Sequence, residues 1–181
     1  MKRMLAYTLM LVMTITTTAL ADQDLGQLLE SGIYQEQTVG DLDAAIKSMV
    51  TSQHTLLKQL QTVRGDIHAC TDITGFGLLG HLGEMLLNSP ELMVQLDGSA
   101  IPAYPGALEL FERGVSSTLA PSNRAAWRWL ESPVQLQQPP SAALLELLVD
   151  PQTCGPLLLA CTSEAAAQLT RNGPWLQIGN A

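Results

Sequence analysis

The chain has 181 residues, of which 46% are hydrophobic and only 14% are charged, and its formal net charge is −8. This length suits one domain with a buried core. The nine Lys and Arg residues are scattered along the chain, whereas nucleic-acid binding needs a clustered basic face. The composition therefore excludes a nucleic-acid partner, and the shortage of charge indicates a surface that another domain or a second copy of the chain covers.

The first 21 residues have the outline of a secretory signal. They contain two cations, an apolar run over residues 4–13, and Ala19–Leu20–Ala21 before Asp22. This pattern is typical of a signal peptide that is cleaved after Ala21. The run is too short and too rich in threonine to cross a membrane, so we expect no membrane span.

The cysteines and histidines give no sign of a metal centre or a disulfide framework. No C-x-x-C pair occurs, and no histidines stand at zinc spacing from the three cysteines. A reducing, cytoplasmic location is the simpler interpretation of such unpaired thiols. The residues concerned are Cys70, Cys154, Cys161, His54, His68 and His81.

Helical and strand patterns alternate along the rest of the chain, without an internal repeat. The pattern therefore predicts an α+β fold, a mixed β-sheet with helices packed on it. Expected helices cover residues 24–32, 41–61, 78–87, 105–113, 123–131, 142–149 and 163–171; expected strands cover 67–71, 92–96, 157–161 and 175–178.

The stretch CTDITGFGLLGHLGEM, residues 70–85, combines a carboxylate with closely spaced glycines. Asp72 should stand at the end of a strand, where it offers the hard oxygen that Mg²⁺ prefers. Thr74, Gly75 and Gly77 then lead into a helix, whose first N–H groups suit a phosphate. The segment predicts a magnesium and phosphate corner, with Asp72 as the metal ligand.

A purely structural interpretation of the same stretch stays open. Aspartate after a strand often forms an Asx-turn or caps a helix, and glycines often mark a tight turn. We expect His81 to brace the loop rather than bind a metal, and Glu84 to face solvent. The later segment Asp150–Pro156 also predicts only a turn that leads into a buried strand, and Cys154 is a weak nucleophile candidate because no base lies near it in sequence.

Together these segments resemble the C-terminal half of selenophosphate synthetase (selenide, water dikinase), within the aminoimidazole ribonucleotide synthetase-like superfamily. The resemblance covers about residues 15–179 and is strongest from Ala69 onward. It is carried by T-D-I-T-G-F-G-L-L-G-H, P-G-A-L-E-L, Asn123–Arg124, D-P-Q-T and the closing Ile178–Gly179. The T-D-I-T-G-F-G-L-L-G-H and D-P-Q-T segments favour this family over another relative in the superfamily.

The resemblance implies an ATP- and Mg²⁺-dependent enzyme that converts selenide, ATP and water to selenophosphate, AMP and phosphate. The family's metal-binding aspartate corresponds to Asp72, and Thr74, Gly75 and Gly77 would form the wall of the nucleotide site. The family also implies a homodimer, with the D-P-Q-T turn supporting the dimer or the cleft.

The departures from the family are as informative as the match. The family carries its nucleophilic cysteine or selenocysteine, a catalytic lysine and most metal carboxylates in an N-terminal ATP-binding half. We therefore assign no catalytic residue here, and we expect that half to be supplied in cis or in trans and the domain to be inactive alone. The family also has glycine where this chain has Pro156, which removes a backbone N–H.

The same resemblance offers a second interpretation of the N-terminus. The family sequence K-P-L-G-T-G is missing between Thr14 and Ile15, so residues 1–21 resemble a degenerate family segment ahead of a domain at 22–181. The alternative is an exported, non-catalytic binding domain that is cut after Ala21.

Overall fold

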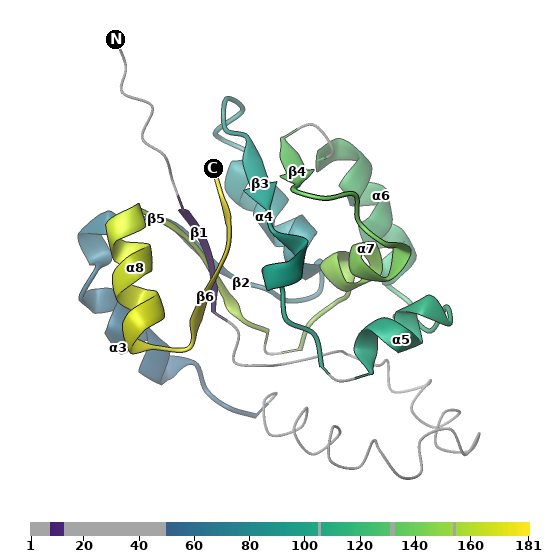
Figure 1. Cartoon of the computed structure of the whole chain (residues 1–181), viewed down its shortest axis with the longest axis horizontal. Helices are drawn as coiled ribbons and strands as arrows, with labels where there is room; N and C mark the ends of the chain where they lie inside the picture. The colour runs from purple at the N-terminus through teal and green to yellow at the C-terminus, as the bar shows by residue number, and fades with distance from the viewer. Residues whose placement is uncertain (1–7, 13–49, 105, 131–132, 154) are drawn as a thin grey trace.

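The computed structural model describes residues 8–12, 50–104, 106–130, 133–153 and 155–181 (Figure 1). Their centre is a six-stranded sheet in the order β2-β5-β1-β6-β3-β4. Adjacent strands are antiparallel except β3 and β4, which are parallel. This mixed sheet with packed helices confirms the predicted α+β class. The strands are β1 (Thr8–Val12), β2 (Ile67–Asp72), β3 (Val94–Leu96), β4 (Val134–Leu136), β5 (Leu157–Cys161) and β6 (Trp175–Asn180).

Helices cover both faces of the sheet (Figure 1). On one face lie α4 (Gly77–Leu86), α6 (Ala120–Leu130) and α7 (Ala142–Val149), with α5 (Ala107–Glu112) packed against α7; on the other lie α3 (His54–Gln61) and α8 (Ser163–Asn172). Strand β5 supplies both cores by alternation: Leu158 packs with α4 and α7, whereas Leu157 and Leu159 pack with α3 and α8. The sheet is therefore the middle of three layers.

Side-chain caps and short 3-10 turns set several element boundaries. The Ser141 hydroxyl accepts from the Leu144 N–H at the start of α7, and Thr162 accepts from the Ala165 N–H at the start of α8. The 3-10 turn η1 (Arg64–Asp66) leads into β2, and η2 (Gly98–Ala100) follows β3. The expected helix at 24–32 and the part of the 41–61 helix before residue 50 lie outside the described residues, and the described part is helical only from His54 onward.

Strand β1 corrects the signal-peptide interpretation of the N-terminus. Met10 pairs with Leu159 of β5 on one side and with Gln177 of β6 on the other. Cleavage after Ala21 would therefore remove a strand from the middle of the sheet, so the exported alternative is not supported. The boundary at residue 22 stays a prediction, although β1 precedes it and belongs to the same sheet.

Two strands were missed from sequence for different reasons. A strand whose two faces are both covered by helices carries a continuous apolar run rather than an alternating one, and residues 8–12 therefore looked like a hydrophobic signal segment. Strand β4 has only three residues, too few to show a period. None of the helices in the described ranges is both long and apolar enough to cross a bilayer.

Candidate functional site

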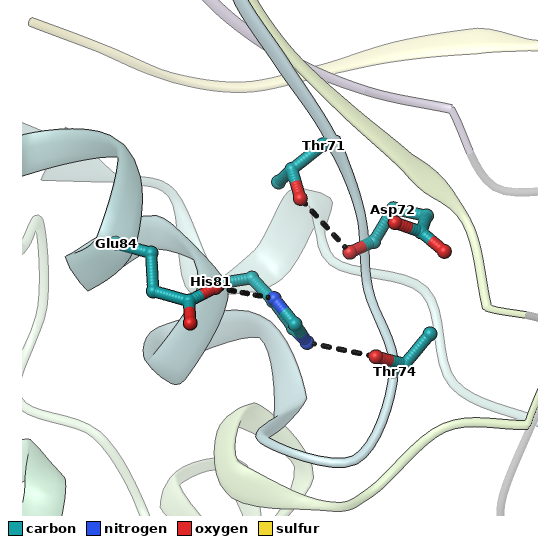
Figure 2. A network of polar contacts seen from close by, with 5 residues as sticks. All are labelled: Thr71, Asp72, Thr74, His81 and Glu84. Carbon is teal, nitrogen blue, oxygen red and sulfur yellow. Dashed lines mark hydrogen bonds and ion pairs between the residues drawn. The ribbon is translucent and has the colours of Figure 1, made fainter.

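Asp72 is the last residue of β2, at the strand end where the sequence predicted it, and its side chain is exposed. Strand β2 is the edge of the sheet, and Asp72 pairs in register with Leu157. Directly paired residues of antiparallel strands share a face, so Asp72 lies on the α3 and α8 side. Figure 2 shows its carboxylate directed away from His81 and the loop that follows.

An open pocket of about 770 Å³ lies beside Asp72. Its walls are residues 50–54 and Leu57 from the start of α3, residues 70–72 of β2, and Gly155 and Leu157. The Gln53 side-chain amide donates to the Gly155 carbonyl. This bond joins the start of α3 to the turn at residues 150–156, called the late turn below. The exposed carboxylate therefore has room for a ligand at the sheet edge.

Thr74 belongs to a short chain of polar side chains on the opposite side of β2 (Figure 2). Its hydroxyl lies 3.1 Å from His81 Nε2, and His81 Nδ1 lies 2.9 Å from Glu84 Oε2. His81 is buried, whereas the Glu84 side chain is 54% exposed. His81 braces the loop as expected; its pairing with Glu84 was not expected.

The two glycines of the loop are held in different ways, Gly75 by a side chain and Gly77 by close contact with neighbouring backbone. Asn123 Nδ2 donates to the carbonyls of Gly75 and Val149, each at 2.9 Å. Gly77 has φ +68°, and a Cβ there would lie 2.6 Å from the Val149 carbonyl carbon. Its N–H donates to the Thr74 carbonyl at 3.0 Å. Glycine at 77 is thus required by the turn and by its contact with the end of α7.

The late turn lies directly against this loop, although the sequence separates them widely. The Gln152 N–H donates to the Thr74 carbonyl at 3.0 Å, and the Ile73 N–H donates to the Pro156 carbonyl at 2.8 Å. A Cβ on Gly155 would lie 1.9 Å from the Ile73 carbonyl oxygen. Proline at 156 keeps its carbonyl, so the contact with Ile73 survives the departure from the family pattern.

Beneath the late turn lies an ionic group that the sequence did not predict. Arg124 Nη1 donates to Glu146 Oε2, and Gln152 Nε2 donates to Asp150 Oδ2 at 3.1 Å. Glu146 and Asp150 are 8% and 2% exposed. Burial, followed by the charge of Glu146, raises the pKa of the Asp150 carboxyl to about 7, and the Gln152 hydrogen bond partly opposes this. A glutamate inside the apolar helix pattern at 142–149 was the available signal.

The described cysteines do not resemble activated nucleophiles. Partial desolvation, then the charge of Asp72, raises the pKa of the Cys70 thiol, and burial raises the pKa of Cys161 to about 11. Both thiols are free, and Cys154 lies outside the described residues. Among the residues that the structure describes, no three His, Cys, Asp or Glu side chains converge to hold a metal.

Residues 20–179 match the family model of the AIR synthase related protein, C-terminal domain. The chain belongs to this family. Within it, the chain is 35% identical over 150 residues to the selenide, water dikinase of Pseudomonas straminea, a match that covers 80% of this chain and 41% of the relative. The selenide, water dikinase of Pelobacter propionicus is 39% identical over 123 residues, covering 67% and 34%.

These matches confirm the resemblance found in the sequence motifs. The chain spans about two fifths of the length of these dikinases, or less. Among solved structures, a hydrogenase maturation protein HypE superposes with a TM-score of 0.51 at 18% identity, over 96% of this chain and 43% of that one. Thiamine monophosphate kinase from Aquifex aeolicus gives 0.50 at 13% identity, over 96% and 46%. Both support the fold alone.

Proposed function

We propose that this chain is the C-terminal domain of an ATP- and Mg²⁺-dependent selenide, water dikinase, to which it contributes Asp72 as one metal ligand. The observation that carries the proposal is the exposed Asp72 carboxylate at the end of β2, beside an open pocket of about 770 Å³. The similarity of the chain to selenide, water dikinases supports this assignment.

The donor chemistry at Asp72 fits magnesium. Mg²⁺ in phosphate-transferring sites keeps several waters and takes one or two protein carboxylates together with substrate phosphates. A single exposed carboxylate next to open space therefore meets what one domain would have to supply. When bound, the ion would offset the negative charge of the nucleotide phosphates.

The remaining residues of the corner would shape the nucleotide site. Thr74, Gly75 and Gly77 would form its wall, held in place by His81, Asn123 and the late turn. Positioning of this kind matters because phosphoryl transfer depends on several fixed charges acting together. One carboxylate without the others should not support turnover, so we propose that the domain is inactive by itself.

The other groups that the reaction needs would come from another half of the enzyme. An N-terminal ATP-binding half, in cis or in trans, would supply the nucleophile, the lysine and the other carboxylates, and the complete enzyme would be a cytoplasmic homodimer. The low fraction of charged residues, 14%, suits a domain whose surface is partly covered.

A chimaera tests the proposal. The chain is fused behind the N-terminal part of the Pseudomonas straminea dikinase, in place of the matching region, and AMP formation from ATP is measured with and without selenide. We expect selenide-dependent AMP from the chimaera, a loss of at least about 100-fold in Asp72→Asn because a metal ligand is removed, and no AMP from the chain alone.

Glu164→Gln provides the matched carboxylate control, because Glu164 is exposed in the first turn of α8. It should leave the activity of the chimaera unchanged. AMP formation that survives Asp72→Asn at the level of this control would refute the role of Asp72. Selenide-dependent turnover by the chain alone would refute the need for a second half.

A further inference from the structure

Among the described side chains, the ionic group beneath the late turn has one positive charge for two buried carboxyl groups. Arg124 on α6 pairs with Glu146 on α7, and Asp150, the C-cap residue of α7, follows four residues after Glu146. Residues four apart on a helix lie on the same face. Two ionised carboxylates there would leave a buried negative charge uncompensated, which is costly in a low-dielectric interior.

Glu146 also has an unsatisfied atom. Arg124 donates to Glu146 Oε2, whereas Glu146 Oε1 is buried and has no hydrogen-bond partner among the described residues. Buried side-chain oxygens nearly always accept a hydrogen bond, so an isolated one requires an explanation. A proton on the neighbouring carboxyl group would supply the missing donor.

Among the described side chains of the surrounding helices, no charged group balances Asp150. On α4, His81 and Glu84 pair with one another. On α5, Glu109 and Glu112 are exposed. Glu146 is the described charged residue that acts on Asp150, and its effect is repulsive. The proton is therefore needed to balance the group as well as to satisfy Glu146.

We propose that Asp150 carries a proton in the folded protein and donates it to Glu146 Oε1, and that this hydrogen bond holds the late turn against the T-G-F-G loop. Asp150 is thus a positioning residue for the candidate metal and phosphate corner. The raised pKa of Asp150 agrees with this assignment.

The route from Asp150 to the loop runs through its neighbours in sequence. The Val149 carbonyl shares the Asn123 amide with Gly75, and the Gln152 N–H donates to Thr74. Loss of the proton would place a second negative charge beside Glu146 and push α7 and the turn apart. The two hydrogen bonds that flank Asp150 should then open more often.

The first test is a titration of the intact chain by NMR, in which the side-chain carboxyl ¹³C signal of Asp150 is assigned by its absence in Asp150→Asn. We expect its midpoint near neutral pH, and a midpoint at lower pH in Glu146→Gln, which removes the repulsion. An Asp150 signal that titrates below pH 5 in the wild-type chain would overturn the proposal. The wild-type titration decides the proposal without any variant. If Asp150→Asn does not fold, the Asp150 signal is assigned from its shift in Glu146→Gln or from a partial assignment of the wild-type spectrum.

Hydrogen exchange measures the effect on the loop. Protection of the Gln152 amide, corrected for the intrinsic exchange rate, should fall by about tenfold between pH 6 and 8.5, since each pH unit above the midpoint can change the balance tenfold. The Leu159 amide of β5 is the internal reference for global unfolding, and Gln152 should exchange faster than Leu159 at each pH, which shows that local opening of the turn is being measured. In Asp150→Asn the amide group can still donate to Glu146, so the pH dependence at Gln152 should disappear. Equal pH dependence in the variant and the wild type would reject the positioning role. Neither measurement uses catalysis, so its outcome is independent of the dikinase assignment.

Discussion

The backbone N–H of Gln152 donates a 3.0 Å hydrogen bond to the carbonyl of Thr74. It joins the D-P-Q-T turn to the T-G-F-G loop, the two segments that carry the family resemblance. Asn123 adds a second link between the loop and the end of α7. Both segments therefore hold the loop that follows Asp72 in place, and a substitution in either segment should change the geometry of the candidate site.

Gly77→Ala should destabilise the protein by about 3 kcal/mol or more. Alanine would be strained at φ +68°, and its Cβ would meet the Val149 backbone at 2.6 Å. Gly106→Ala is the matched control, because Gly106 has φ +84° and a Cβ at this position would meet nothing within 4 Å. That variant should lose only about 1 kcal/mol from strain. Urea unfolding measures both, and equal losses would show that contact with Val149 does not matter.

Asn123→Ala should cost about 2–4 kcal/mol of unfolding free energy. The side chain is buried, and its loss leaves the Gly75 and Val149 carbonyls without their shared donor. Gln138→Ala removes a similar amide from an exposed position and should change stability by less than about 0.5 kcal/mol. A loss for Asn123→Ala as small as the control's would argue against the bridge.

The stability of the chain should contain a term from Asp150 that decreases between pH 4 and pH 7. The carboxyl binds its proton more tightly when folded, with a pKa of about 7, than when unfolded, where the ordinary value is 3.8. The unfolded state therefore loses its proton first as pH rises, and stability falls until the folded pKa is passed. The free energy of unfolding of Asp150→Asn, relative to that of the wild type, should rise by on the order of 4 kcal/mol between pH 4 and pH 7.

Asp97 provides a control for that experiment, because its pKa is shifted in the opposite direction. Hydrogen bonds from the Ser99 side chain and backbone lower the pKa of the exposed Asp97 carboxyl. Its contribution is present above the ordinary pKa and is lost as pH falls below it. Asp97→Ala should therefore keep the decrease between pH 4 and 7. Chemical unfolding at a series of pH values separates the two, and an unchanged difference between Asp150→Asn and wild type would count against the Asp150 term.

A chain that begins at Asp22 should fail to fold cooperatively. It lacks β1, so β5 and β6 lose the strand that pairs with both of them. A chain without residues 1–7 keeps all five paired residues and should unfold like the full-length protein. Circular dichroism during thermal unfolding compares the two truncations. A sharp transition in the chain from Asp22 would show that β1 is dispensable.

Much of the candidate site could be predicted from local sequence. Asp72 follows an alternating strand pattern, and the glycines precede a clear helical pattern, so a carboxylate at a strand end next to a glycine turn was predictable. The role of Gly77 was visible only in part. Sequence indicated a turn, but the close approach to Val149 depends on α7, which lies far away in the chain.

The buried group at Asp150 shows where such prediction fails. Local pattern places Glu146 in an apolar helix and Asp150 before a proline, but it cannot show that Arg124 pairs with only one oxygen of Glu146. Desolvation and charge balance depend on all the atoms that surround a group. The raised pKa of Asp150 therefore follows from packing, which no local window contains.

The fold class, the family and the position of Asp72 could be inferred from residue periodicity and short motifs, because these act within one element or one turn. Which elements meet depends on the three-dimensional arrangement: β1 lies in the middle of the sheet, the late turn lies against the T-G-F-G loop, and two buried carboxyl groups lie beside a half-exposed arginine. These depend on contacts between distant segments, whose free energy comes from burial and pairing rather than from local preference.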